Sequence, residues 1–444
     1  MKAIIVPGVT DLNKGDQALV WESHRIIEDT KLFSEVSVLS LGDTKEEYQL
    51  LCSQTEAKGL RLITNILKHP RRGKHPKNNV IGENVMYLFY QIFNALKDLF
   101  TRGLLLNVCN NTFVTKLLFS KETNTTVNEF KKADVIFVKG GGFIHAHGEK
   151  TAPYVMWFFL FYIKLAKKLH KKVVILPNSY GPFDGFSVKK QIKNAFKNVD
   201  LILARENISA EKITALLQKE VAVSPDLGFY LKQSDKAVGR KVLNNYHFNE
   251  SDKVVGITIR PWRFPGKENP EALYEKYIKS VKEVALHIDS KGYKVAFFNQ
   301  SLGPNSHEDD RNAIQYLLDS FNPEDKKKFT WVNENLNCED LKSVYSNLYF
   351  FIGTRFHSVI FSMTSIVPSI AIGYGGNKAK GIMKDFHLNE YVIQIEDVTS
   401  QDLITMFDLG IVNYEHIKSE LQKNIVQLEL KRHAAIETIK KAIQ

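Results

Sequence analysis

The sequence predicts an α/β protein built from two Rossmann-like, doubly wound domains. Short runs of β-branched and aliphatic residues alternate with longer segments of helical period, which is typical of parallel sheets with crossover helices. This alternation occurs twice, before and after the polar stretch 232–252. The 444 residues suffice for two or three domains, and a hydrophobic fraction of 44% is ordinary for a globular protein.

The first half carries six strand candidates, which are short apolar runs at 2–7, 35–41, 134–139, 172–176, 200–204 and 221–225. Helix candidates lie between them at 15–30, 152–170, 187–198 and 207–218. Residues 55–130 interrupt the alternation, and they include an aromatic, amphipathic segment at 85–100. We therefore expect a helical insertion over 55–130 in the first domain.

The second half repeats the pattern, with strand candidates at 253–260, 293–298, 329–333, 349–353, 368–373 and 391–395. Its helix candidates are 271–291, 307–321, 338–346, 356–365, 377–386 and 415–443. We expect an N-terminal domain over 1–235 and a C-terminal domain over 236–414. At about 1.5 Å per residue, the remaining helix, 415–444, is long enough to pack back on the first domain.

The net charge of +11 is concentrated in two segments. Segments 57–77 and 164–172 hold twelve Lys and Arg residues and no acid, while the rest of the chain carries 48 basic against 49 acidic residues. No zinc finger, basic zipper, KH or RRM signature accompanies them, so we expect no nucleic-acid partner. The patches flank the most aromatic segments, 85–100 and 152–163, which suits docking to anionic lipid headgroups. The alternative is that both aromatic segments are buried core helices with lysines at their wet ends.

Cysteine content and apolar runs indicate the compartment. Cys52, Cys109 and Cys338 are odd in number, far apart and without CxxC spacing, so we expect neither a disulfide framework nor a structural zinc site. The run that follows Met1-Lys2 is too short for a signal peptide. The longest apolar stretch, 152–163, is shorter than the roughly 20 residues of a spanning helix. The expected location is the cytoplasm, either free or at the inner face of the membrane.

Ligands of doubly wound sheets bind beyond the carboxyl ends of the strands, so the residues there are candidates for a site. The first such loop contains Asn13, Gly15 and Asp16 and leads into a helix. A glycine there lets a ligand approach backbone amides at a helix N-terminus, where the helix dipole favours an anion. The alternative is a turn glycine with Asp16 capping the helix.

A glycine triplet, Gly140, Gly141 and Gly142, follows the next of these strands. Three consecutive glycines cost conformational entropy, so they indicate a binding loop or a tight structural turn. His145 and His147 stand two residues apart, which suits a strand face more than a helical metal pair, and we expect no metal site there.

Three further strand ends of the first domain bring Asn178, Arg205 and Asp226 to the same edge. A lone arginine is usually solvated or salt-bridged, so Arg205 could instead pair with Glu206 or another neighbour.

The second domain places Arg260, Arg355 and His357 at strand ends, and Lys378 after the next strand. Arginine forks bind phosphate or carboxylate in a bidentate manner, and a histidine exchanges protons near neutral pH. There is no Asp or Glu between residues 341 and 384, which favours an anionic ligand over a local salt bridge. The alternative for His357 is a hydrogen-bonded structural histidine.

Taken in order, these segments resemble the polysaccharide pyruvyl transferase family. The matching pieces are NKGDQAL at 13–19, the glycine triplet, NSYGP at 178–182, LARE at 203–206, SPDLGF at 224–229, ITIR at 257–260, GTRFH at 353–357 and YGGNK at 374–378. The resemblance implies a fold similar to GT-B glycosyltransferases, with two domains that face a cleft. It also implies transfer of a pyruvyl group from phosphoenolpyruvate to two hydroxyls of a sugar, which forms a cyclic ketal. The match is weaker over 55–130.

The resemblance also implies roles for the candidate residues. His357, together with Arg355, would be catalytic, with His357 as general acid and base. Arg205, Arg260, Arg355 and Lys378 would bind the donor, phosphoenolpyruvate. Contacts to the acceptor sugar, free or polyprenyl-linked, would come from Asn13, Asp16, Gly140, Gly141, Gly142 and Asn178. We expect no metal and no cofactor besides the donor substrate.

Two other functions remain open from the sequence. One is a GT-B glycosyltransferase with a nucleotide-sugar donor, although many such enzymes hold the donor ribose with an acid that 341–384 lacks. The other is a non-catalytic scaffold of a glycan-assembly complex. In a pure scaffold, the presence of Arg260, Arg355, His357 and Lys378 at strand ends would be a coincidence.

Overall fold

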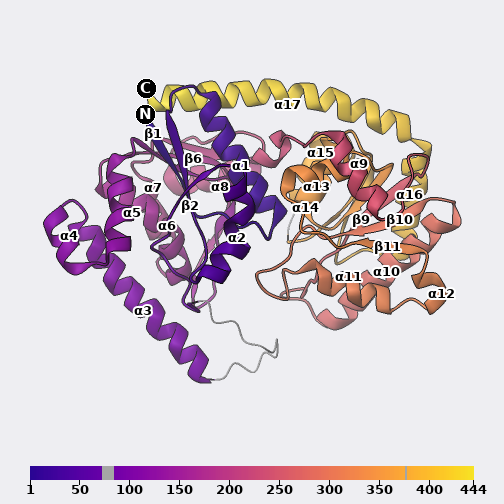
Figure 1. Cartoon of the computed structure of the whole chain (residues 1–444), viewed down its shortest axis with the longest axis horizontal. Coiled ribbons are helices and arrows are strands. Elements are labelled where there is room, and N and C mark those ends of the chain that lie inside the picture. Colours follow the sequence, from indigo (N-terminus) through magenta and orange to yellow (C-terminus); the bar gives the residue numbers. More distant parts are fainter. Residues whose placement is uncertain (73–84, 376–377) are drawn as a thin grey trace. The chain divides into compact units, whose positions relative to one another are not determined.

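The computed structural model describes residues 1–72, 85–375 and 378–444, which form two compact units (Figure 1). Unit 1 comprises residues 1–11, 19–227 and 431–444, and unit 2 comprises residues 12–18 and 228–430. The chain passes from unit 1 to unit 2 at 227/228. The inclusion of residues 12–18 in unit 2 is a feature that no periodicity of the sequence indicates.

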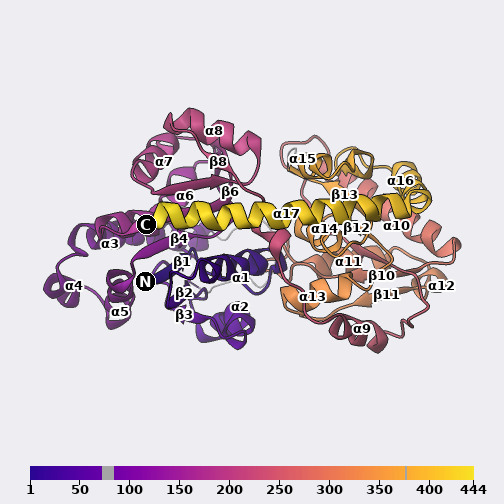
Figure 2. The same cartoon turned by 90° about the horizontal axis from the view of Figure 1, so that it is seen from above.

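Unit 1 is built on an eight-stranded sheet in which every pair of neighbours is parallel. Its strands are β1 (Lys2–Val6), β2 (Glu35–Leu39), β3 (Arg61–Ile63), β4 (Val135–Val138), β5 (Gly141–His147), β6 (Lys172–Asp184), β7 (Leu201–Ala204) and β8 (Ala222–Val223). The order is β3-β2-β1-β4-β6-β7-β8, with β5 paired to β6, and Figure 2 shows this succession from β3 to β8. In register, Ala3 of β1 lies between Val36 and Val135.

The helices of this part of the chain are α1 (Lys14–Asp29), α2 (Lys45–Ala57), α3 (Val85–Val108), α4 (Thr112–Leu118), α5 (Lys121–Lys132), α6 (Ala152–Lys168), α7 (Val188–Phe196) and α8 (Asn207–Leu217). The described parts of the interrupted region, 55–72 and 85–130, are mainly helical, as expected, but they also hold β3. The sequence analysis missed α2, whose polar residues show little periodicity. Its start is fixed by Thr44, whose side chain accepts a hydrogen bond from the Glu47 amide.

The segment 139–149, which the sequence analysis treated as a loop, contains β5. β5 pairs in parallel with the last part of β6, residues 178–184, and the register between the two strands is irregular. Glycine and proline residues in both segments resemble turn signals, yet the irregular pairing accommodates them. His145 and His147 are exposed on β5 while Ala146 between them is buried, which is the strand-face spacing that their sequence positions indicated.

The two aromatic segments have different environments. α6 is a core helix, in which Met156, Leu160 and Phe161 are fully buried. The basic patch that follows it is engaged within unit 1, because Lys167 pairs with Asp200 at 3.1 Å. The helix α3, in contrast, leaves much of its apolar surface exposed. The alternative that both segments are buried therefore holds for α6 only.

Unit 2 is built on a six-stranded parallel sheet in the order β11-β10-β9-β12-β13-β14. Its strands, all six predicted from the sequence, are β9 (Val254–Thr258), β10 (Lys294–Phe298), β11 (Phe329–Val332), β12 (Phe350–Gly353), β13 (Ser369–Gly373) and β14 (Val392–Gln394). This is the 3-2-1-4-5-6 order of the Rossmann fold. The order reverses between β9 and β12, the position at which such sheets bind ligands, and the corresponding position in unit 1 lies between β1 and β4.

The helices of the second part are α9 (Lys236–Asn245), α10 (Pro270–Ser290), α11 (Asp310–Asp319), α12 (Pro323–Lys326), α13 (Cys338–Tyr345), α14 (Phe356–Met363), α15 (Lys378–Asp385), α16 (Ser400–Val412) and α17 (Tyr414–Ile443). α9 lies in the polar stretch 232–252, where the sequence predicted no helix. It packs closely on α13, because a Cβ on Gly239 would lie 2.3 Å from the Ser343 carbonyl oxygen. Near the end of α17, Arg432 pairs with Asp29 at 2.5 Å inside unit 1.

Candidate active site

The carboxyl ends of β9 and β12 bring Arg260 and Arg355 to the reversal point of the unit 2 sheet. Gly353 of β12 pairs with Thr258 of β9, and the Thr354 amide donates to the Thr258 carbonyl at 3.0 Å. Arg260 therefore follows one strand and Arg355 the adjacent one. Each is buried, with less than a tenth of its surface exposed.

Arg355 is held by a buried ion pair. Its Nη2 lies 2.6 Å from Oδ1 of Asp310, its Nε donates to the same oxygen at 2.8 Å, and Nη2 donates to the Glu308 carbonyl. Burial alone would lower the pKa of Arg355, but the Asp310 carboxylate raises it, so the pKa lies above the usual value of arginine. The acid-free stretch 341–384 indicated that Arg355 has no local salt bridge, and its carboxylate partner indeed lies outside that stretch, 45 residues away in the chain.

Asp310 is itself fixed by the backbone. Its Oδ2 accepts hydrogen bonds from the amides of Gln300 at 3.0 Å and Ser301 at 2.9 Å. Both carboxylate oxygens are thus engaged, one by the backbone and one by Arg355. Asp310 was not predicted from the sequence, because an acid at the start of a helix is an ordinary surface feature and carries no sign of its distant partner.

Arg260 is stabilised by aromatic rings. Its guanidinium carbon lies 4.1 Å from the ring centroid of Tyr374 and 4.7 Å from that of Trp262. Burial lowers the pKa of Arg260 and the nearby charge of Arg355 acts in the same direction, whereas Tyr374 and Asp310 oppose the shift. Among the residues that the structure describes, no carboxylate forms an ion pair with Arg260. A cation of this kind can bind an anionic ligand with its N–H edge while its faces rest on the rings.

His357 lies against the start of α1, which belongs to unit 2. A Cβ on Gly15 would lie 2.2 Å from Nδ1 of His357 and 2.9 Å from its Cβ, so only glycine allows this approach. The cap of the helix is Asn13, whose Oδ1 accepts from the amides of Gly15 at 3.0 Å and Asp16 at 3.4 Å. Gly15 thus serves close packing rather than a turn, and the cap is Asn13 rather than Asp16.

Lys14 adds a buried cation to this part of unit 2. Its side chain is almost fully buried, its Nζ donates to Asn335 Oδ1 at 2.7 Å, and its amide donates to the Gln300 carbonyl at 3.0 Å. Gln300 therefore connects the start of α1 to the Asp310–Arg355 pair. Lys14 was not predicted from the sequence, because a lysine between polar residues normally points into solvent.

In unit 1, Arg205 is part of a salt-bridged cluster. Its Nη1 lies 2.7 Å from Asp226, its Nε lies 3.3 Å from Glu206, and the same Nε donates to Ser179 Oγ at 2.5 Å. A Cβ on Gly142 would lie 2.8 Å from Arg205 Nη2. Arg205 is therefore salt-bridged, which is the alternative that the sequence left open for it. Gly142 of the glycine triplet makes room for its side chain.

Asn178 is fully buried beside this cluster. Its Nδ2 donates to the carbonyls of Lys139 and Leu176, at 2.9 and 2.8 Å. Its Oδ1 has no hydrogen-bond partner among the described residues and lies 3.7 Å from the position that a Cβ on Gly141 would take. A buried acceptor without a donor is costly and suits a site that a ligand completes.

The structure therefore separates the candidate residues into two sets. The unit 2 set contains Arg260, Arg355 and His357, and it also contains Asn13 and Asp16, which we expected to group with the glycine triplet. The unit 1 set comprises Gly140, Gly141, Gly142, Asn178 and Arg205. Lys378 begins α15, but its side chain lies outside the described residues.

In the described part of the chain, no group of three or more His, Cys, Asp or Glu side chains is arranged to hold a metal ion. Cys52, Cys109 and Cys338 are buried free thiols. Within the described ranges, no helix combines the length and apolar character needed to cross a bilayer.

Solved structures with the same fold define a broad class for this chain. UDP-GlcNAc 2-epimerase from Neisseria meningitidis is similar with a TM-score of 0.57 and 12% identity, covering 99% of this chain and 100% of that one. A glycosyltransferase from Rickettsia africae is similar with a TM-score of 0.53 and 12% identity, covering 100% and 98%. At such identities the likeness shows the fold alone, and it confirms the predicted α/β, GT-B-like class.

The sequence specifies the family within that class. The polysaccharide pyruvyl transferase model matches residues 13–376, and the chain belongs to this family. The amylovoran biosynthesis protein AmsJ of Erwinia amylovora is 23% identical over 432 residues, which are 96% of this chain and 96% of that protein. The resemblance inferred from the strand-end motifs is thereby confirmed, and the family supports a transferase that acts on polysaccharide.

Proposed function

We propose that this protein transfers a pyruvyl group from phosphoenolpyruvate to two hydroxyls of one sugar and so forms a cyclic ketal. The acceptor is a sugar of an exopolysaccharide or of its lipid-linked precursor. Family membership supports the transferase class, and a relative named for amylovoran biosynthesis supports a role in making a polysaccharide.

The environment of Arg260 is the observation that carries the choice of donor. Phosphoenolpyruvate has a carboxylate and a phosphate, and both require cations in a site that excludes water. Arg260 is a buried guanidinium that lies against the adjacent rings of Trp262 and Tyr374 and has no carboxylate partner among the described residues. Its charge is thus available to a ligand, whereas the charge of Arg355 is offset by Asp310.

His357 is proposed as the group that moves protons. It gives a proton to the methylene carbon of phosphoenolpyruvate, which makes C2 electrophilic, and the first sugar hydroxyl then adds to C2. The C2–O bond to phosphate breaks, and the second hydroxyl closes the ring. The two hydroxyl protons end on the new methyl group and on the released phosphate. A contribution of about 10² to 10⁴ in rate is typical of such a residue.

Asn178 of unit 1 is proposed to contact the acceptor sugar. The buried Oδ1 of Asn178 can accept a hydrogen bond from a sugar hydroxyl, which would satisfy it. This assignment predicts that Asn178→Ala lowers the apparent affinity for the sugar more than that for phosphoenolpyruvate.

The deciding experiment is incubation with phosphoenolpyruvate and a panel of free and polyprenyl-linked sugars. The expected result is release of inorganic phosphate together with a product heavier by one pyruvyl unit, and loss of both in His357→Ala. Thermal shift should show stabilisation by phosphoenolpyruvate and none by UDP- or GDP-sugars. Stabilisation and turnover with a nucleotide sugar alone would overturn the proposal in favour of a glycosyltransferase.

A further inference from the structure

The helix α3 presents an apolar stripe away from the protein. Phe89, Phe93, Leu96 and Phe100 recur at the spacing of one helix face, and each is between 60% and 75% exposed. A helix on the surface of a water-soluble protein normally turns such a face toward the core.

The opposite face of α3 is polar and faces unit 1. Asn94 and Asp98 are buried, and Arg102 is half-buried. The Asn94 side chain donates to the Pro70 carbonyl at 2.9 Å, and Asp98 pairs with Arg72 at 2.6 Å. As far as Arg102, α3 therefore packs with polar residues and leaves its apolar stripe exposed, whereas Leu105 near its end is buried in the core of unit 1.

The next helix extends the apolar surface. On α4, Phe113, Leu117 and Leu118 are at least half exposed, and α4 packs against α3. Contiguous apolar surface of this kind marks a contact with another molecule or with a membrane.

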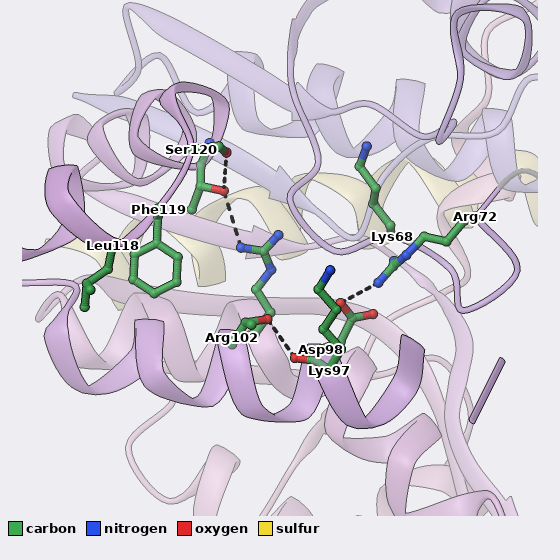
Figure 3. A pocket seen from close by; sticks show the side chains of 10 residues that line it. Lys68, Arg72, Lys97, Asp98, Arg102, Leu118, Phe119 and Ser120 are labelled. Carbon is green, nitrogen blue, oxygen red and sulfur yellow. Dashed lines mark hydrogen bonds and ion pairs between the residues drawn. The ribbon is translucent and has the colours of Figure 1, made fainter. Parts of the chain in front are cut away.

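Residues of α3, α4 and α5 and of the segment 68–72 line a cationic pocket (Figure 3). Its volume is about 450 Å³, and four basic side chains line it, namely Lys68, Arg72, Lys97 and Arg102. Asp98 is the acid in the lining, and it is paired with Arg72. The pocket adjoins the stripe, because Lys97 follows Leu96 in the chain and Leu118 belongs to both the lining and the exposed surface.

We propose that the α3–α4 surface docks on a bilayer that contains anionic phospholipid. The stripe enters the boundary between headgroups and acyl chains, and the pocket binds a lipid phosphate. A length of about 36 Å, at 1.5 Å per residue, lets α3 lie in the plane of the membrane. A second copy of the chain fits less well, because a symmetric contact would bring identical cationic pockets together.

Vesicle sedimentation tests this surface on the full chain. Wild type is expected to bind vesicles of phosphatidylcholine and phosphatidylglycerol in equal parts, with binding that falls as salt rises. Phe93→Ser with Phe100→Ser should lower the partition coefficient by more than about tenfold, because two aromatic side chains no longer leave water. Phe186→Ser removes an even more exposed phenylalanine from the loop before α7 and should bind as wild type.

The pocket is tested by neutralising Lys68 and Lys97. The double change to glutamine should lower binding to the anionic vesicles roughly 25-fold, at about fivefold per basic residue, and leave binding to pure phosphatidylcholine unchanged. Changing Lys189 and Lys190, exposed on α7, to glutamine alters the net charge equally and should have little effect.

Three outcomes would overturn the proposal. The first is that the wild-type protein does not bind the anionic vesicles. The second is that the double phenylalanine variant binds them as strongly as the wild-type protein does. The third is that light scattering shows a dimer of the wild-type protein, that the double phenylalanine variant is monomeric, and that neither protein binds vesicles. Circular dichroism should show that all variants remain folded. The surface shares no residue with the proposed chemistry, so these outcomes leave the test of pyruvyl transfer independent.

Discussion

Arg260 and Arg355 follow neighbouring strands of the same sheet, yet their charges are balanced in different ways. Arg355 is neutralised by Asp310, which the amides of Gln300 and Ser301 hold in place. Arg260 rests on Tyr374 and Trp262 and has no ion pair within the described residues. The difference suggests a division of labour, in which Arg355 organises the site and Arg260 binds the anionic donor.

The largest effect is expected from removing the partner of Arg355. Asp310→Ala leaves a buried guanidinium without its carboxylate, which typically costs about 3–5 kcal/mol in the free energy of unfolding. Denaturant unfolding measures this loss, and Ser306→Ala in the preceding loop is a control with little expected effect. A loss below about 1 kcal/mol would mean that Arg355 is not held by this pair.

The same substitution at both arginines tests the comparison directly. Arg260→Lys should raise the Michaelis constant for phosphoenolpyruvate about tenfold to a hundredfold with an unchanged melting temperature, because a charged hydrogen bond is worth about 1.5–3 kcal/mol. Arg355→Lys should lower the melting temperature, because lysine cannot replace the hydrogen bonds of the guanidinium to Asp310 and to the Glu308 carbonyl. It should also weaken donor binding, because Arg355 organises the site in which Arg260 binds the donor. Identical effects of the two variants on stability and on donor affinity would abolish the distinction.

A smaller effect is expected at Gly15. Alanine normally stabilises a helix relative to glycine by about 1 kcal/mol, but here its Cβ would collide with the imidazole of His357. We expect Gly15→Ala to cost about 1–3 kcal/mol through overpacking and to lower turnover by displacing His357. The control is Gly103→Ala on α3, because a Cβ at Gly103 would meet no atom within 4 Å. An active and more stable Gly15→Ala variant would contradict this packing.

The smallest effect is expected at Arg205. Arg205→Lys keeps the charge near Asp226 and Glu206 but loses the hydrogen bond from Nε to Ser179, at a cost of about 1 kcal/mol in stability. Chemical unfolding and phosphoenolpyruvate kinetics should show a small loss of stability and little change in donor affinity. A loss of donor affinity as large as that of Arg260→Lys would place Arg205 in the donor site after all.

The strands and the strand-end residues could be predicted because both are local patterns. Buried strands appear as short apolar runs, and the residues that follow them lie at one edge of a parallel sheet, as with Arg260 and His357. The Asp310–Arg355 pair could not be predicted, because it joins residues 45 positions apart through the fold. Likewise, the burial of Lys14 depends on Asn335 and Gln300, far along the chain.

The contrast between α3 and α6 shows a further limit. Both segments are aromatic and lie near a basic patch, so their composition does not distinguish a core helix from an exposed one. The polar residues of α3 distinguish them in the structure. Asn94 and Asp98 lie on the face that packs, which forces the phenylalanines outward. The periodicity of a helix predicts that one face is apolar and the other polar, but it does not predict which face packs against the rest of the protein.

The membership of residues 12–18 in unit 2 has a consequence for biosynthesis. These residues leave the ribosome long before the segment 300–357 that supplies Gln300 and His357. Domains generally fold as units during synthesis, starting from the N-terminal side. Residues 19–227 of unit 1 can therefore fold early, whereas the start of α1 must wait for the segment 300–357, and residues 431–444 complete unit 1 last. A chain interrupted before residue 357 can thus retain an ordered first sheet yet lack the packing of Gly15 on His357.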